Sequence, residues 1–409
     1  MFEEPLSRAS HVVRWVALAV VVAVFSGLLS AAFIVSLDWA TETRETRDWL
    51  IYTLPLCGLF VGCSYHYLGR GLERGSNLVI DQVHDHSEWI PFRLTPLIFV
   101  GSIVSHLGGG STGREGAAIQ LAAGITDPIS KSLKLNSVDR SLMLITAIAA
   151  GFGSVFGVPV TGAIFALEVQ RVGRVRYDAL VPAFVASFVG DAVVRGLGVE
   201  HTHFPLMPKV AWTTTIAWQV ALFGIIAGLI ALLFVRLTHL IKNVAKKYIA
   251  WYPARPFIGG ILVAALIVVF GWRDYSGVSV PLALEAMNGS TDGQWAVKLG
   301  LTALTLGTGF VGGEVIPLFV MGALAGAMYA SVIGANVALF AIIGSVAVLA
   351  GAANTPLACS LLGVELFGGN GLVLFALVCA SAYAASGHTG IYHAQKVSAP
   401  KNPLRRSPS

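Results

Sequence analysis

Two glutamates stand in glycine-rich turns inside a chain whose neighbouring segments are almost entirely apolar. The first is Glu115 in GSTGREGAAIQ (residues 110–120), and the second is Glu314 in GFVGGEVIPLF (residues 309–319). A charged side chain at the centre of a lipid span costs about 2.5–3.5 kcal/mol on insertion scales. Because ionisable residues at such depth mark ion or proton pathways, the two turns predict an ion-handling site.

Glu115 begins an apolar run after a glycine-rich turn, so we expect it in the first turn of a helix. The free N–H groups of a helix N-terminus carry partial positive charge and attract anions. An ionised Glu115 would take the place of a bound anion, and a protonated Glu115 would leave it. We therefore interpret Glu115 as a gate and proton carrier, with a simple helix cap as the alternative. Arg114 is interpreted as a counter-charge first and an ion ligand second.

Other polar residues fall into four groups. Glu314 can pass protons onward or favour a particular anion, and the alternative is a capping role. The hydroxyl of Tyr392, in SGHTGIYHAQ (residues 386–395), can donate to an anion. We expect structural or interfacial roles for the acids that end two apolar segments and a plain loop role for a histidine pair without further ligands. These residues are Glu168, Glu365, His84 and His86.

The composition indicates a polytopic membrane protein. Of 409 residues, 55% are hydrophobic, 12% are charged and 45 are glycine, and the mean hydropathy is +0.74. This is more apolar surface than one soluble core buries. Residues 16–36 and 214–235 are nearly charge-free and long enough to cross a hydrocarbon layer of about 30 Å. The four cysteines lie in apolar runs without metal-ligand spacing, so we expect no metal and no cofactor.

The net charge of +5 arises from short ends and loops, which argues for membrane topology and against nucleic-acid binding. By the positive-inside rule, basic ends and loops are cytoplasmic. We expect a multi-pass protein of the cell's inner (cytoplasmic) membrane with both termini in the cytoplasm and a basic tail at 396–409. The basic residues concerned are Arg8, Arg14, Lys242, Lys246, Lys247, Arg255, Lys396, Lys401, Arg405 and Arg406.

A repeat is visible in the spacing of the glycines, prolines and acids. The two glutamates of each copy are 53 and 51 residues apart, since 168 − 115 = 53 and 365 − 314 = 51. Paired halves with Gly- and Pro-broken apolar segments predict discontinuous helices that meet near the midplane of a transporter. Helix packing through small residues explains many glycines but not a glutamate in both copies. The matching positions are Gly113-Arg114-Glu115 with Gly312-Gly313-Glu314, Ala150-Gly151 with Ala350-Gly351, Pro159 with Pro356, and Glu168 with Glu365.

These motifs resemble the CLC family of anion channels and anion/proton antiporters over essentially the whole membrane chain. The GREG run at 113–116 is similar to the family's gating-glutamate motif, with Ala117 in place of the usual proline. The stretch 309–323 resembles the GxFxP region, 75–78 (GSNL) takes the place of the GSGIP loop, and Tyr392 falls where the family has its anion-coordinating tyrosine.

The resemblance implies a fold, an assembly and a set of site residues. The expected fold is an all-α inverted-topology repeat with re-entrant helices, with residues 1–200 as the first half and 201–395 as the second. A homodimer in membrane lipid, with one pathway per subunit, is implied as well. The implied gating and proton-transfer residues are Glu115 and Glu314. The implied anion-binding residues are Ser76, Asn77, Gly113, Arg114, Gly116, Ala117, Gly313, Val315, Ile316 and Tyr392.

Departures from the chloride members point to the fluoride/proton antiporter clade. Chloride antiporters carry a second proton glutamate where this chain has Val169, whereas a glutamate in GGEV is similar to the fluoride clade. Ile316, in place of that clade's threonine, and Ser76, which is typical of chloride members, differ from the clade's pattern. The expected partners are therefore fluoride, or else chloride, together with protons.

Three functions remain open at this point. The leading one is export of fluoride in exchange for protons, and the alternatives are a chloride antiporter and a passive anion channel of the same family. An intramembrane hydrolase would use the serine loop GGGSTG (residues 108–113) with His388 or His393 as base. Nothing else in the sequence supports that chemistry, so we expect a protein that is not an enzyme.

Overall fold

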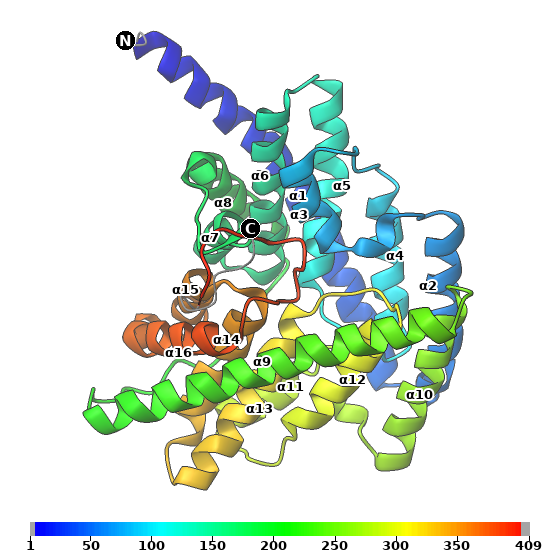
Figure 1. Cartoon of the computed structure of the whole chain (residues 1–409), viewed down its shortest axis with the longest axis vertical. Helices are drawn as coiled ribbons and strands as arrows, with labels where there is room; N and C mark the ends of the chain where they lie inside the picture. The colour runs from blue at the N-terminus through cyan, green and yellow to red at the C-terminus, as the bar shows by residue number, and fades with distance from the viewer. Residues whose placement is uncertain (1–4, 402–409) are drawn as a thin grey trace.

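The computed structural model describes residues 5–401 and is helical almost throughout (Figure 1). The first eight α-helices form the first half of the chain and the next eight the second half. The helices of the first half are α1 (Pro5–Glu45), α2 (Leu54–Tyr67), α3 (Ser76–Asp85), α4 (Leu94–Leu107), α5 (Glu115–Ser132), α6 (Ser137–Phe156), α7 (Pro159–Glu168) and α8 (Leu180–Gly196). Those of the second half are α9 (Thr214–Tyr248), α10 (Ala254–Phe270), α11 (Val280–Met287), α12 (Trp295–Gly307), α13 (Val315–Ile333), α14 (Val337–Ala353), α15 (Pro356–Phe367) and α16 (Leu372–Ala385).

The two halves repeat the same local signals in the same order. Asn136 caps the start of α6 and Asn336 caps the start of α14, each through its side-chain oxygen. A proline occupies the first position of both α7 and α15, where its missing N–H costs nothing. The repeat predicted from the sequence is therefore confirmed at the level of individual helices.

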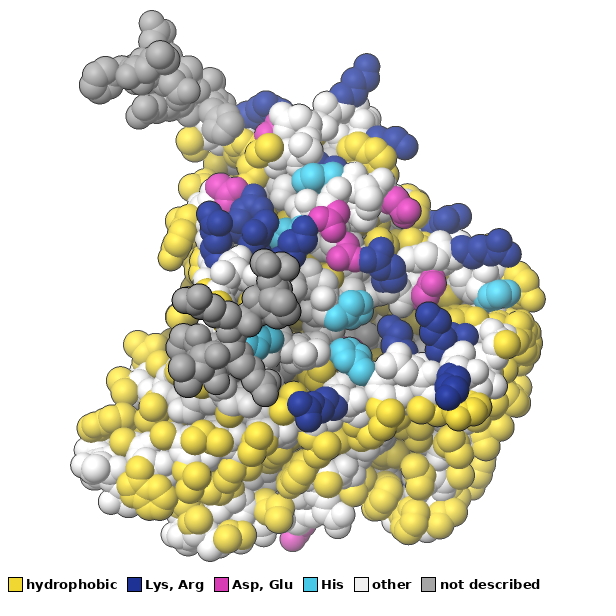
Figure 2. All heavy atoms as spheres, in the orientation of Figure 1, with side chains coloured by type: hydrophobic (Ala, Val, Ile, Leu, Met, Phe, Trp, Pro, Cys, Tyr) yellow, Lys and Arg dark blue, Asp and Glu magenta, His cyan; other side chains and the backbone are white. Residues whose placement is uncertain are grey.

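Long and short helices share the membrane region. In the part of the chain that the structure describes, five helical segments are long and apolar enough to cross a membrane: Val12–Glu45, Ser137–Phe156, Tyr177–Gly196, Thr214–Tyr248 and Val315–Ile333. The other apolar helices are shorter, as expected for segments broken by glycine and proline. Figure 2 shows hydrophobic side chains covering the lower part of one face, with Lys and Arg side chains gathered above them. The first two predicted spans lie within the two longest of these segments.

Small residues allow the closest helix packing in the second half. A Cβ atom on Gly322 of α13 would lie 2.0 Å from the carbonyl oxygen of Gly344 in α14. A Cβ on Gly326 would lie 1.9 Å from the Phe340 carbonyl. Any larger residue at either position would push the two helices apart, so these glycines serve packing, as the small-residue pattern predicts.

Two acids join the halves by capping each other's helices. The carboxylate of Glu168, at the end of α7, accepts backbone N–H bonds of 3.1 and 2.8 Å from the first turn of α15. The carboxylate of Glu365, near the end of α15, accepts bonds of 2.9 and 2.6 Å from the first turn of α7. Each carboxylate satisfies two N–H groups that a helix leaves unpaired. The structural role expected for both acids is confirmed.

The segment 388–401 after α16, which we name the strap, connects distant parts of the chain. Its strand β2 (Lys396–Val397) pairs in parallel with β1 (Arg171–Val172). The Asn77 side chain accepts a bond of 3.0 Å from the Ala394 N–H, and the Gln395 amide donates to the Val169 carbonyl at 3.0 Å. The first part of the predicted tail, 396–401, thus packs against the membrane domain, and residues 402–409 lie outside the described residues.

Candidate functional site

The two glycine-rich turns meet in the middle of the molecule. Gly113 and Gly313 exchange both backbone hydrogen bonds, 2.7 and 2.6 Å long, as an isolated antiparallel bridge. A Cβ atom on Gly313 would lie 2.8 Å from the Gly116 nitrogen and 2.9 Å from the Glu115 nitrogen. Only glycine permits this approach. The bridge brings the N-termini of α5 and α13 together.

Glu115 is the first residue of α5, as expected, and its side chain is fully buried. Its Oε2 accepts a bond of 3.3 Å from the Ile316 N–H of α13 and one of 3.2 Å from the Arg114 N–H. Its Oε1 has no hydrogen bond within residues 12–401, and the Arg114 Nε is 3.6 Å away. The carboxylate therefore occupies the N-terminus of a helix from the other half, where a free anion would also be stabilised.

Arg114 lies between two acids. Its Nη1 is 3.8 Å from the Asp38 carboxylate at the end of α1, and its Nε faces Glu115. The side chain is 13% exposed. This geometry agrees with the interpretation of Arg114 as a counter-charge.

Glu314 does not occupy the position that Glu115 occupies in the repeat. Helix α5 starts at Glu115, whereas α13 starts at Val315, and Glu314 is the residue before it. The backbone angles of Glu314 (φ −106°, ψ −17°) match those of Arg114 (φ −111°, ψ −23°). Together with the pairing of Gly113 with Gly313, this makes Arg114 the counterpart of Glu314. The glutamate-to-glutamate alignment drawn from the sequence is therefore wrong by one residue.

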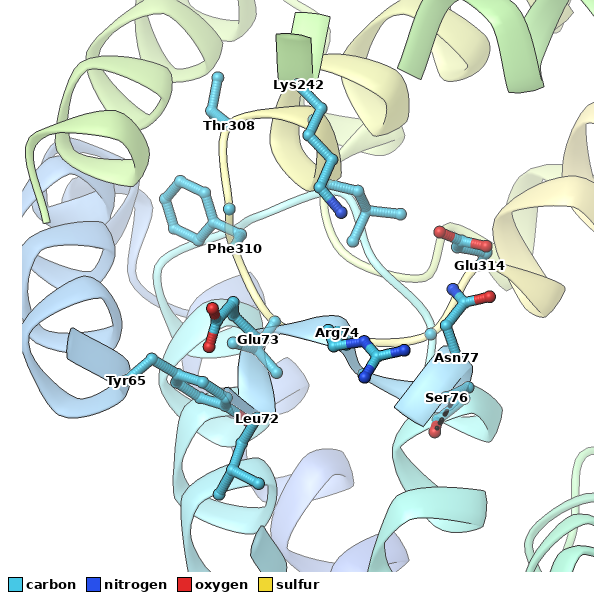
Figure 3. Close-up of a pocket in the computed structure, with 18 of the residues that line it drawn as sticks. Tyr65, Leu72, Glu73, Arg74, Ser76, Asn77, Lys242, Thr308, Phe310 and Glu314 are labelled. Atoms are coloured by element: carbon cyan, nitrogen blue, oxygen red, sulfur yellow. Dashed lines mark hydrogen bonds between the residues drawn. The ribbon is translucent and has the colours of Figure 1, made fainter. Parts of the chain in front are cut away.

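A cavity of about 380 Å³ lies on one side of the crossing and is lined by half of the predicted anion-binding residues (Figure 3). We name it the strap-side cavity because Ile391 and Tyr392 of the strap line it. The Glu314 side chain lines the same cavity and accepts no hydrogen bond from any described residue. The predicted residues among its lining are Ser76, Asn77, Gly116, Gly313, Glu314 and Tyr392.

Three elements place polar groups in this cavity. The Ser76 hydroxyl, at the start of α3, donates to the Gly116 carbonyl at 3.0 Å, and the Gln120 amide donates to the same carbonyl at 3.0 Å. The Tyr392 ring is 96% buried and packs edge-on against Phe165 at 6.1 Å. The Tyr392 hydroxyl makes no hydrogen bond in the described part of the chain, so it is free to donate to an ion.

A second cavity, of about 750 Å³, lies on the other side of Glu115. We name it the α11-side cavity because the start of α11, Val280, lines it. Arg114 and Ile316 line it as well. Arg114, which precedes Glu115, thus faces the α11-side cavity, and Gly116, which follows it, faces the strap-side cavity. The Glu115 carboxylate stands between the two.

Some predicted residues frame the site without lining a cavity. Ala117 and Val315 are fully buried next to the crossing, and Gly113 forms the bridge. Conversely, most residues that line the strap-side cavity were not predicted as site residues, Gln120 and Lys242 among them. Gln120 lies one helical turn after Gly116, and this spacing could have signalled it. Lys242 had been assigned to topology only.

The histidine pair does not lie in a loop as expected, because His84 belongs to the last turn of α3 and His86 directly follows that helix. His84 shares a hydrogen bond of 2.8 Å between its Nε2 and the Gln170 carbonyl. The described residues contain no group of three or more His, Cys, Asp or Glu side chains that could hold a metal ion.

Comparison with known proteins decides the family. The model of the family described as "Voltage gated chloride channel" matches residues 57–387. The chain belongs to the voltage-gated chloride channel (CLC) family. It is therefore a multi-pass integral membrane protein of CLC fold, and the resemblance stated from the motifs is confirmed.

Two solved structures and one curated relative sharpen this placement. A chloride/fluoride channel protein from Pseudomonas syringae pv. tomato is 42% identical over 404 residues, which cover 96% of this chain and 89% of the relative. The crystal structure of a CLC-type fluoride/proton antiporter superposes with a TM-score of 0.92 at 31% identity, covering 97% of this chain and 100% of that one. A slow cyanobacterial Cl⁻/H⁺ antiporter gives a TM-score of 0.77 at 19% identity, covering 91% and 94%, and this likeness supports the fold alone.

Proposed function

We propose that this CLC protein exports fluoride in exchange for protons, with Glu115 as gate and proton carrier. The observation that carries the proposal is the position of the Glu115 carboxylate. It accepts the Ile316 N–H at the start of α13 and lies between two cavities that open on opposite sides. A group that blocks an anion site while charged and leaves it when neutral couples anion movement to proton movement.

The exchange cycle follows from this geometry. An anion that enters the strap-side cavity needs the helix N-terminus that the Glu115 carboxylate occupies. Protonation removes the charge of Glu115 and weakens its bonds to the N–H groups, so the carboxyl swings away and the anion takes its place. Return of Glu115 requires loss of that proton. Glu314, in the strap-side cavity, is the acid that we propose as its next carrier.

Fluoride rather than chloride is favoured by the acids. Fluoride is small and strongly hydrated, so a site must replace its water with hydrogen-bond donors. A protonated carboxyl, the Tyr392 hydroxyl and backbone N–H groups are such donors. Val169, where chloride antiporters have their inner proton glutamate, is 1% exposed and apolar. Glu314 is then the acid left to act with Glu115. The similarity to a structure described as a CLC-type fluoride/proton antiporter supports fluoride as the anion.

The strap-side cavity is proposed to face the cytoplasm. Arg14 near the start of α1 pairs with Asp139 at the start of α6 at 3.3 Å. The Ser141 hydroxyl of α6 bonds to α3 at 2.9 Å, and Lys396 of the strap pairs with Asp85 at the end of α3 at 2.5 Å. The start of α1, the strap and this cavity therefore lie on one face. Both ends of the chain would be cytoplasmic in the inner membrane.

The basic residues support this orientation. Lys242, Lys246 and Arg255, which the positive-inside rule places in the cytoplasm, line the strap-side cavity. We also propose that residues 1–200 and 201–395 act as the two halves of one pathway, and that two subunits form a homodimer in lipid with independent pathways.

The test is a flux measurement on purified protein in liposomes. An outward fluoride gradient is expected to drive protons inward against their own gradient, with fluoride release and internal pH recorded together. Chloride in place of fluoride is expected to drive little proton movement. Fluoride release without uphill proton movement would support the passive channel, and equal coupling with chloride would support the chloride antiporter, which Ser76 favours. Covalently linked dimers of one Glu115→Gln and one native subunit should keep about half the coupled flux.

A further inference from the structure

The two cavities on either side of Glu115 carry opposite charge. The strap-side cavity is lined by four basic and two acidic side chains, and the acids are Glu73 and Glu314. The α11-side cavity is lined by six acidic and four basic side chains.

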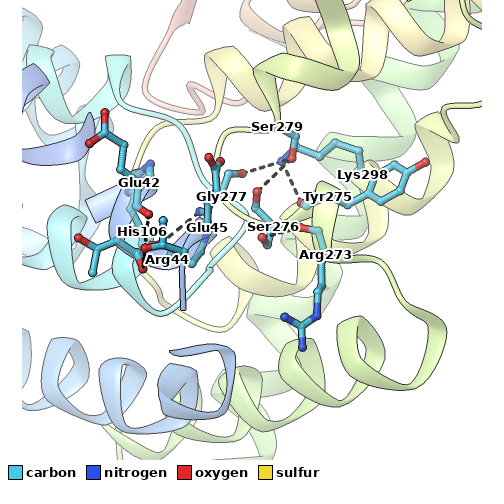
Figure 4. Close-up of polar contacts among 12 residues, drawn as sticks. Glu42, Arg44, Glu45, His106, Arg273, Tyr275, Ser276, Gly277, Ser279 and Lys298 are labelled. Atoms are coloured by element: carbon cyan, nitrogen blue, oxygen red, sulfur yellow. Dashed lines mark hydrogen bonds and ion pairs between the residues drawn. The ribbon is translucent and has the colours of Figure 1, made fainter. Parts of the chain in front are cut away.

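Ion pairs neutralise only some of the acidic side chains that line the α11-side cavity. Arg44 pairs with Glu45 at 3.3 Å, Arg114 lies 3.8 Å from Asp38, and Arg273 pairs with Asp48. The lining acids without an ion pair in the described residues are Glu42, Asp274 and Glu285, and one lining cation, Arg47, is likewise unpaired. All three acids are exposed to the cavity opening. Figure 4 shows Glu42 extending away from the paired cluster around Arg44.

Lys242 is a cation that lines the strap-side cavity and forms no ion pair in the described part of the chain. Figure 3 shows its side chain extending from α9 into the space bordered by Glu314 and Asn77. It makes no ion pair or hydrogen bond with a described residue. Lys246 and Arg255 lie at the same opening. An ion that enters therefore meets positive charge before it reaches the α13 N-terminus.

We propose that this charge asymmetry gives the transporter a sided affinity, with Lys242 as its main determinant on the strap side. Clefts lined by one sign of charge concentrate ions of the opposite sign. The strap-side cavity then collects anions, and the α11-side cavity repels released anions while it collects protons. The inference deepens the proposed fluoride/proton exchange and rests on it, since both ions must pass these two openings.

The expected size follows from Coulomb's law and from screening. A unit charge about 10 Å from an ion, at an effective dielectric constant of about 40, changes local ion concentration roughly fourfold. Salt weakens this effect because the Debye length falls from about 30 Å at 0.01 M to about 8 Å at 0.15 M. Loss of one cavity charge should therefore change the half-saturating anion concentration on that face severalfold at low salt and much less at high salt.

The experiment measures half-saturating fluoride separately on each face. Inside-out and right-side-out membrane vesicles expose the two cavities in turn, and potassium gluconate sets the ionic strength. Lys242→Gln is expected to raise the half-saturating fluoride about threefold to fivefold on the strap-side face at low salt and less than twofold at high salt. Its matched control is Lys247→Gln, which removes the same charge from a lysine on α9 that does not line the cavity.

The opposite face provides an independent variant. Glu285→Gln is expected to lower the half-saturating fluoride on the α11-side face, whereas Glu88→Gln, at an exposed glutamate that lines neither cavity, is expected to leave it unchanged. Equal effects of Lys242→Gln and Lys247→Gln, or an effect that is the same on both faces or at both salt concentrations, would overturn the inference. If native protein exchanges chloride and not fluoride, the same constants are measured with chloride. Failure of fluoride selectivity is thereby distinguished from failure of the charge asymmetry.

Discussion

Glu115 and Glu314 stand in matching turns of the two halves, yet their surroundings differ in every respect that matters for transport. Glu115 is the first residue of its helix, is fully buried and is held by the N–H of a helix from the other half. Glu314 precedes its helix, lines a cavity and accepts no hydrogen bond from a described residue. One residue of offset thus separates a buried, hydrogen-bonded carboxylate from an acid that lines a cavity.

The comparison shows how an inverted repeat produces two different surroundings from one kind of turn. Equivalent positions in the two halves face opposite sides of the molecule, so Arg114 lines the α11-side cavity and Glu314 lines the strap-side cavity. The next position points inward in both halves and holds Glu115 in one and the fully buried Val315 in the other. The proposed exchange therefore does not need the two acids to occupy equivalent positions of the repeat.

The largest expected effect comes from Glu115→Gln. The amide resembles the protonated carboxyl in shape but cannot release a proton, so proton coupling should be lost completely. Simultaneous recording of fluoride release and pH in liposomes measures this. Glu200→Gln, an exposed change of the same charge, should keep normal coupling. Uphill proton movement by Glu115→Gln would exclude the gating role.

Glu314→Gln is expected to abolish fluoride/proton exchange while the protein folds normally. Its carboxylate holds no helix end, so its loss should change the free energy of unfolding by no more than about 0.5 kcal/mol. Flux in liposomes and thermal unfolding in detergent are measured on the same preparation. If Glu314→Gln still catalysed full coupled exchange, Glu314 would have no role in transport.

The glycines of the bridge should differ in their sensitivity. The added methyl of Gly313→Ala would meet backbone nitrogens at 2.8 and 2.9 Å, which cannot yield, whereas that of Gly113→Ala would meet the Pro317 ring and the Glu115 carboxylate. Overpacking of this kind costs about 1–3 kcal/mol. We expect Gly313→Ala to lower the free energy of unfolding more than Gly113→Ala does. For a given loss of unfolding free energy, we expect Gly113→Ala to lose more of the proton coupling. Equal losses in both properties would show that the two turns are interchangeable.

The smallest effects are expected at the reciprocal caps, where the halves are most alike. Glu168→Gln and Glu365→Gln each weaken two charge-assisted bonds at a helix start and should each cost about 0.5–2 kcal/mol. Thermal unfolding measures both, with proton coupling as the second measurement. Similar losses of stability with normal coupling are expected. A loss of coupling in only one of them would reveal a functional asymmetry that the geometry of the caps does not show.

Most of the helical fold and half of the site could be predicted from the sequence. Long apolar runs identify α1 and α9, because a lipid span needs length and hydrophobicity that are visible locally. Glu115 at the start of α5 follows from the glycine turn before it. The register of Glu314 could not be found, because a one-residue shift depends on where the helix begins. The position of Lys242 in the cavity could not be predicted either, because it depends on how α9 passes the turn that holds Glu314.

The sequence by itself determined that this protein spans a membrane, repeats one helical unit twice and carries an acid at each broken helix. Hydrophobicity, glycine and proline act through the local backbone, so their effects are present in the order of residues. Only the tertiary structure decided that Gly113 pairs with Gly313, that Ile316 of one half holds Glu115 of the other, and that the two cavities differ in charge. These relations join residues about 200 positions apart, and they exist only because the two halves cross at the centre of the fold.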